Sequence, residues 1–113
     1  MTSILRPLLE LTDNVVSHGT IFRFPGVWPY EQMVDLMLFD NPDEQHPHGF
    51  IVCTGHKAGL ILVLLPRESS NPNGRSVRTE WLVSEWTHWV YADCPVEKVQ
   101  VLRRYPAPIP GET

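Results

Sequence analysis

The sequence predicts a single α+β domain, built on a mainly antiparallel sheet of about four to five strands with two helices. Short apolar stretches of strand length alternate with two longer stretches of helical periodicity, in the order β-α-β-β-α-β. The loops between them contain most of the chain's glycine and proline. A chain of 113 residues, 42% of them apolar, can enclose one hydrophobic core. We therefore expect residues 1–113 to form one domain.

The N-terminal half predicts one strand and one helix. Residues 1–16 are expected to be extended or a short helix, and the alternating residues 20–24 predict a strand that Pro25-Gly26 ends. Residues 29–40 predict a helix, because Pro29 suits a first helical position and apolar residues recur at helical spacing. These apolar residues are Tyr30, Met33, Val34, Met37 and Leu38. A strand over 34–39 is the alternative.

The second half predicts a hairpin, a helix and a last strand. Residues 50–54 and 60–65 are strand-like and are joined by five residues with a glycine at each end. Because residues 60–65 are all apolar, we expect this strand to lie centrally in the sheet. Residues 77–90 predict the second helix and 97–103 the final strand. The proline-rich residues 105–113 are expected to be a flexible tail.

Charge and composition exclude several classes of protein. Thirteen acidic residues against nine basic ones give a net charge of −4, which argues against nucleic acid as a partner. No apolar stretch is long enough to cross a membrane, and the start of the chain does not resemble a signal peptide. Cys53 and Cys94 do not form a secreted disulfide framework. We therefore expect a cytoplasmic protein without a membrane partner.

Two short motifs invite a chemical interpretation, and neither is well supported. Cys53 and His56 could form a nucleophile pair, but no residue pattern around them supplies the orienting group that such a pair needs. His46-Pro47-His48, with acidic residues nearby, is only half of a zinc site. We therefore expect no catalytic residue, no metal and no cofactor. A small thiol enzyme using Cys53 and His56 remains the alternative function.

The four tryptophans are Trp28, Trp81, Trp86 and Trp89. Trp86 and Trp89 fall on the apolar stripe of the second predicted helix, so we expect them in the core. Trp81 falls off that stripe and is expected to be exposed. An exposed tryptophan suits a protein interface. Trp81 is therefore a candidate partner contact.

Three patterns together are similar to the immunity protein 45 family of bacterial polymorphic-toxin systems, over residues 19–103. They are Pro25-Gly26-Val27-Trp28-Pro29-Tyr30-Glu31, Gly55-His56-Lys57-Ala58-Gly59-Leu60, and the tryptophan-rich run from Trp81 to Tyr91. The resemblance implies a cytosolic protein that binds and neutralises a cognate toxin domain from contact-dependent inhibition or another interbacterial secretion system. It carries over no catalytic residues. An adaptor module without a toxin partner is a further alternative.

The charge is unevenly distributed along the chain. Residues 1–50 carry seven acids and two bases, whereas residues 51–113 carry six acids and seven bases. Many interbacterial toxins are nucleases with basic clefts, which an acidic face would complement. We therefore predict that the toxin contact is bordered by Glu31, Asp35, Asp40, Asp43 and Glu44. An ordinary solvated face is the alternative.

Overall fold

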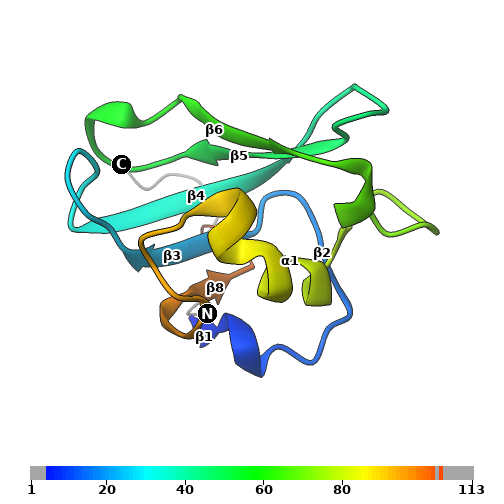
Figure 1. The fold of residues 1–113 in the computed structure, drawn as a ribbon, viewed down its shortest axis with the longest axis horizontal. Coiled ribbons are helices and arrows are strands. Elements are labelled where there is room, and N and C mark those ends of the chain that lie inside the picture. Colours follow the sequence, from blue (N-terminus) through cyan, green and yellow to red (C-terminus); the bar gives the residue numbers. More distant parts are fainter. Residues whose placement is uncertain (1–4, 104, 106–113) are drawn as a thin grey trace, which may run out of the picture.

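An antiparallel sheet of six strands forms the framework of the computed structural model, which describes residues 5–103 and 105 (Figure 1). The strand order is β1-β8-β3-β4-β5-β6. These strands are β1 (Arg6–Pro7), β3 (Ile21–Pro25), β4 (Met33–Asp40), β5 (His48–Val52), β6 (Ile61–Leu65) and β8 (Gln100–Leu102). A second sheet pairs β2 (Val15–Val16) with β7 (Val77–Arg78). The predicted α+β class with a mainly antiparallel sheet is confirmed, but the main sheet has six strands where about four to five were predicted, because β1 and β4 add to the strands expected from the sequence.

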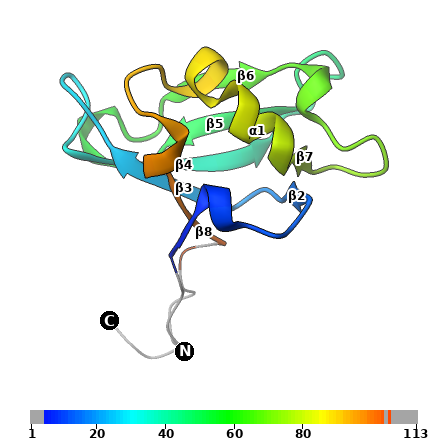
Figure 2. The same ribbon diagram turned by 60° about the horizontal axis from the view of Figure 1, so that its bottom comes forward.

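Helix α1 (Thr79–Glu85) covers one face of the main sheet and continues directly into a π-helical turn, Trp86–Val90 (Figure 2). The described residues also form short 3-10 helical turns at Leu8–Glu10, Gly55–Lys57, Arg67–Ser69 and Val96–Lys98. The helix predicted over 77–90 is therefore confirmed for most of its length. α1 is the single α-helix of residues 5–103, where two were predicted. No helix in these described residues is long and apolar enough to cross a membrane.

The prediction of a helix over 29–40 is wrong, and the strand alternative over 34–39 is correct. Val34, Leu36 and Leu38 alternate along β4 into the core, and each is at most 1% exposed. β4 pairs with β3 on one side and with β5 on the other. Apolar side chains occur on both faces of this central strand, with Met33 and Met37 on the face opposite the core, so the apolar spacing also matches a helix.

The hairpin predicted from residues 50–65 is confirmed, because β5 and β6 pair antiparallel. The predicted central position of β6 is wrong, since β6 forms an edge of the sheet. Leu60 and Ile61, at the start of this strand, are each 57% exposed. The strands predicted over 20–24 and 97–103 are confirmed as β3 and β8. Of the expected tail, only Tyr105 lies within the described residues.

The core lies between the main sheet and the helical layer, and Trp86 is its largest fully buried side chain. The indole packs against three phenylalanines of the sheet. The ring centroids of Phe22, Phe24 and Phe50 lie 5.8, 5.5 and 6.1 Å from that of Trp86. Aromatic pairs at these separations stabilise a core beyond the area that they bury. Trp86 therefore joins the helical layer to β3 and β5.

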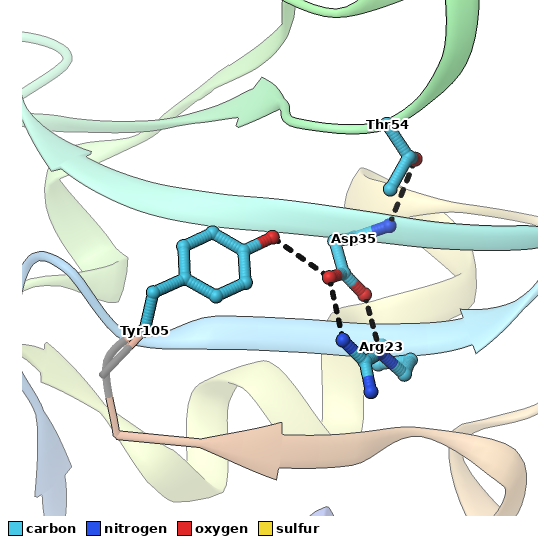
Figure 3. Close-up of polar contacts among 4 residues, drawn as sticks. All are labelled: Arg23, Asp35, Thr54 and Tyr105. Carbon is cyan, nitrogen blue, oxygen red and sulfur yellow. Dashed lines mark hydrogen bonds and ion pairs between the residues drawn. The ribbon is translucent and has the colours of Figure 1, made fainter. Parts of the chain in front are cut away.

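The opposite face of the main sheet, which we call the open face, is not covered by a helix or a second sheet within residues 5–103 (Figure 2). The odd-numbered side chains of β3 and β4 point to this face, because Phe22, Phe24 and Leu36 point into the core. Arg23 and Asp35 therefore lie side by side on the open face, and Tyr105 reaches Asp35 from the end of the described chain (Figure 3).

The turn between β3 and β4 requires a glycine at position 26. A Cβ atom there would lie 2.5 Å from the carbonyl oxygen of Glu31 and 2.5 Å from Cγ2 of the buried Val34. We expect Gly26→Ala to lower the free energy of unfolding by about 1–3 kcal/mol, because backbone must move to relieve the overlap. Urea unfolding followed by far-UV circular dichroism measures this change.

Gly74→Ala is the matched control. Its Cβ would meet only Asn71 Nδ2, at 3.5 Å, and Gly74 lies in an exposed loop. This variant is expected to stay within about 0.5 kcal/mol of the wild type. Equal stabilities of the two variants would show that the β3–β4 turn tolerates a side chain at position 26.

Candidate functional site

The β3–β4 and β5–β6 hairpins turn at the same end of the main sheet (Figure 1). Most of the exposed large apolar side chains belong to the residues of these two turns. We call this region, residues 26–33 and 53–61, the hairpin end. Trp28 is 90% exposed, and the other four large apolar residues exposed here are Val27, Met33, Leu60 and Ile61, at 47–57%. Beyond these five, only Leu9 and Tyr105 are large apolar residues exposed in the described chain. The hairpin end is therefore the main exposed apolar region.

The turn that carries Trp28 is tied to the helical layer. The backbone N–H of Val27 donates a hydrogen bond to the hydroxyl of Tyr91 at 3.1 Å, and that of Tyr30 donates to the carbonyl of Val27 at 2.9 Å. The rings of Tyr30 and Tyr91 meet edge to face, with centroids 5.7 Å apart. These contacts place Trp28 at a defined position although its own side chain is in water. The Trp28–Pro29 peptide bond is cis.

The two hairpin turns of this end contact each other. The Glu31 side chain lies directly against Gly55, where any Cβ atom would overlap it. Lys57 Nζ lies 5.7 Å from the centroid of the Tyr30 ring. Gly55 also has a φ of +67°, a conformation that favours glycine. The Gly55–Gly59 loop therefore leaves room for the Glu31 carboxylate and holds the two turns together.

The structure divides the predicted acidic residues between the two ends of the sheet. Glu31 is exposed at the hairpin end, whereas Asp40, Asp43 and Glu44 lie at or beyond the far end of β4. Eight residues of β4 at about 3.3 Å each put roughly 25 Å between the two groups. They do not form one continuous acidic face.

The loop after β4, residues 41–47, which we call the acidic loop, follows Asp40, whose charge is partly neutralised by Arg75 from another part of the chain. Arg75 donates a hydrogen bond to Asp40, which together with its charge lowers the pKa of that exposed carboxyl below its usual value. His18 lies 3.9 Å from the same carboxylate, and His46 lies 3.7 Å from Asp43. The negative charge of residues 1–50 is therefore partly offset in the folded protein by a base from the second half of the chain.

The predicted helix would have placed Asp35 on an exposed acidic face, but in the structure this residue is buried. It is 3% exposed and accepts two hydrogen bonds from Arg23, from Nε at 2.7 Å and Nη2 at 2.9 Å (Figure 3). The hydroxyl of Tyr105 donates a third, at 2.7 Å, and the backbone N–H of Asp35 donates to Thr54 Oγ1 at 3.1 Å. Asp35 is the centre of a polar cluster on the open face.

The ionisation of this cluster follows from its geometry. Burial alone would raise the pKa of Asp35, but the hydrogen bonds from Arg23 and Tyr105 outweigh burial and lower it. Burial and the bond to Asp35 raise the pKa of the Tyr105 phenol well above its usual value. The carboxylate is thus charged and the phenol neutral at pH 7. This arrangement joins strands and does not supply a proton donor for catalysis.

The structure gives no support to the Cys53–His56 pair. Cys53 Sγ lies 3.7 Å from the carbonyl of Ile51, as a weak hydrogen-bond donor, and burial raises the pKa of the thiol. His56 is exposed in the 3-10 turn, and no hydrogen bond joins it to Cys53. A reactive thiol needs a lowered pKa, so the arrangement around Cys53 opposes nucleophilic catalysis.

The half site at His46 and His48 is not assembled either. His48 faces the core on β5, is 1% exposed, and its Nε2 lies 3.1 Å from Ser70 Oγ. Burial lowers the pKa of His48, so its ring is neutral. His46 is in the acidic loop beside Asp43. Within the described residues no three metal-ligating side chains come together.

The expected exposure of Trp81 is wrong, because this residue is 8% exposed and packs with the core. Its ring centroid lies 6.1 Å from that of Trp89. The π-helical turn after α1 contains more residues per turn than an α-helix, which shifts Trp89 towards the side of Trp81. The predicted core positions of Trp86 and Trp89 are correct, with Trp89 partly buried. Trp28, which sequence analysis left unassigned, is the exposed tryptophan.

Comparison with known proteins gives one match. A family model described as immunity protein 45 matches residues 8–101, which include α1, the hairpin end and both sheets except β1 and the last residue of β8. Neither a curated protein nor a solved structure matches the chain. Since the matched residues make up most of the sequence, the chain belongs to the immunity protein 45 family.

Proposed function

We propose that this protein is a cytoplasmic immunity protein that binds a cognate toxin domain stoichiometrically and neutralises it, with no catalysis of its own. Membership in the immunity protein 45 family carries this proposal. The raised pKa of the Cys53 thiol and the position of His56 favour binding over a thiol-dependent reaction. The toxin belongs to a polymorphic or contact-dependent inhibition system, and neither nucleic acid nor a membrane is a direct partner.

Co-expression tests this function directly. The chain is produced together with the C-terminal toxin domain of an exoprotein encoded beside it, and growth and co-purification are measured. We expect growth to be restored and the two proteins to purify together. Cys53→Ala should protect as well as the wild type, because its thiol takes no part. Failure of the wild type to bind or protect would contradict the proposed function.

Within this function, the acidic loop accelerates encounter with a basic toxin such as a nuclease. Asp43 and Glu44 are exposed and lie away from the apolar hairpin end, so they act through long-range charge. Asp40 adds less, because Arg75 is bonded to it. Asp35 and Trp81, which are buried, are not part of this exposed acidic surface.

Reversing the charge of this loop is expected to slow association. Asp43→Lys together with Glu44→Lys should lower the association rate about tenfold at low ionic strength, and the difference should shrink in high salt. Stopped-flow mixing with the toxin at several salt concentrations measures this. Glu68→Lys with Glu97→Lys is the control, because it changes the net charge equally at other exposed positions. Equal rates for the two double variants would show that the acidic loop has no special role.

A further inference from the structure

Trp28 is the most exposed large apolar side chain of the described residues, and other exposed apolar side chains lie in the same region. The indole is 90% exposed, and the other exposed apolar side chains of the hairpin end come from the same two turns. Isolated exposed apolar residues are common on proteins, but a gathered set marks an interaction surface. Tryptophan is also the residue type most enriched among positions that dominate binding energy.

The backbone around Trp28 is held in place before any partner arrives. Tyr91 accepts a hydrogen bond from Val27, the neighbour of Trp28, and its ring packs on Tyr30 on the other side of the turn. Glu31 lies against Gly55 of the second hairpin. A side chain presented from a fixed backbone loses less conformational entropy on binding than one on a mobile loop.

The shape of the hairpin end indicates a concave partner. The two adjacent hairpin turns form one end of the sheet (Figure 1), and the two hollows described here, both outside residues 26–33 and 53–61, lie away from it. The larger hollow, of about 390 Å³, is lined by β2 and the residues around it, at the other end of β3. Neither of these two hollows therefore lies at the hairpin end, where a two-fold symmetric contact between copies of this chain would need one to receive Trp28.

The charge of the hairpin end adds a second requirement for the partner. The Glu31 carboxylate is exposed beside the apolar residues, and no ion pair joins it to another described residue. Lys57, a base in the facing turn, lies over the Tyr30 ring. A complementary partner would place a cationic or N–H donor group opposite Glu31.

We propose that the hairpin end is the surface that docks on the toxin, with Trp28 inserted into an apolar hollow of the toxin domain and Glu31 paired with a basic group at the rim of that hollow. This inference rests on the proposed function and adds to it the surface and the chemistry of the partner. The hairpin end provides the contact of the bound complex, whereas the acidic loop acts on the approach.

Binding of the purified toxin domain to the full chain tests this surface. Trp28→Ala is expected to weaken the affinity by about 30-fold or more, mainly through faster dissociation, as is typical of a dominant interface residue. Glu31→Gln should weaken it by about three- to tenfold, less so in high salt. Leu9→Ala, which removes a 48%-exposed apolar residue away from the hairpin end, should stay within about twofold.

Three outcomes would contradict the proposal that the hairpin end docks on the toxin. If the wild type binds the toxin and Trp28→Ala binds equally well with an unchanged melting temperature, the hairpin end is not the docking surface, although the function stands. If the wild type does not bind, the proposed function itself fails. If light scattering shows a dimer of the free protein that Trp28→Ala abolishes, the occupant is a second copy, and the proposal is overturned.

Discussion

Replacing Trp86 by alanine is expected to lower the free energy of unfolding by about 3–5 kcal/mol, the largest loss that we expect from any single substitution in this chain. Trp86 is fully buried, and its indole contacts the rings of Phe22, Phe24 and Phe50. Alanine would leave a cavity that β3, β5 and the π-helical turn share, and these cannot close over it without moving the sheet. Urea unfolding followed by far-UV circular dichroism gives the difference.

Trp86→Phe provides the comparison and remains informative if the alanine variant does not fold. The Nε1–H group of Trp86 is buried and has no hydrogen-bond partner among the described residues. Phenylalanine removes that unsatisfied donor while it keeps an aromatic ring, so we expect a loss of only about 1–2 kcal/mol. If Trp86→Phe lowered the free energy of unfolding as much as Trp86→Ala, the stability of the core would depend on the shape of the indole rather than on the buried aromatic area.

Arg23→Met is expected to lower the free energy of unfolding by about 2–3 kcal/mol near neutral pH. The Asp35 side chain is 4% exposed, and without Arg23 its charge would be buried with Tyr105 as its remaining side-chain donor. The loss is smaller than for a fully enclosed pair, because 35% of the Arg23 side chain is open to water. Equilibrium unfolding in urea between pH 3 and 8 measures it.

The pH dependence and a double variant identify the cause. The pKa of Asp35 is lowered in the folded protein, so its contribution is present above the unfolded value of about 3.9 and is lost as the pH falls through the folded value. The difference between Arg23→Met and the wild type should therefore shrink in acid. Arg23→Met combined with Asp35→Leu should recover most of the stability, because no buried charge remains. A double variant less stable than Arg23→Met would refute this explanation.

The elements that sequence analysis predicted well are those whose pattern has a single structural interpretation. The alternation of residues 20–24 and the glycine-bounded loop between residues 54 and 60 specified β3 and the second hairpin. The apolar residues of 33–39 fit both a helix and a central strand. These residues form a strand because they pair with β3 and β5, which lie before and after β4 in the chain. Such pairing is a property of the whole sheet and not of the local sequence.

The site residues were less predictable for the same reason. Asp35 was interpreted as an exposed acid because of its assumed helix, and its partner Tyr105 is 70 positions away in the sequence. Trp81 and Trp28 both have apolar and acidic residues near them in the sequence, yet Trp81 is buried and Trp28 is 90% exposed. The signal that could have singled out Trp28 is its place between Pro25-Gly26 and Pro29, which is typical of a turn.

The strand order of the main sheet has a consequence for how the protein folds. β8, the last strand of the described residues, lies between β1 and β3, which are among the first. The N-terminal strand therefore has no neighbour to pair with until the C-terminal strand has arrived, and contacts between such distant parts of a chain form slowly. During synthesis β3, β4 and β5 can pair in sequence, but the sheet closes only when residues 100–102 are available. A chain that ends before β8 would leave β1 unattached and one edge of β3 unpaired.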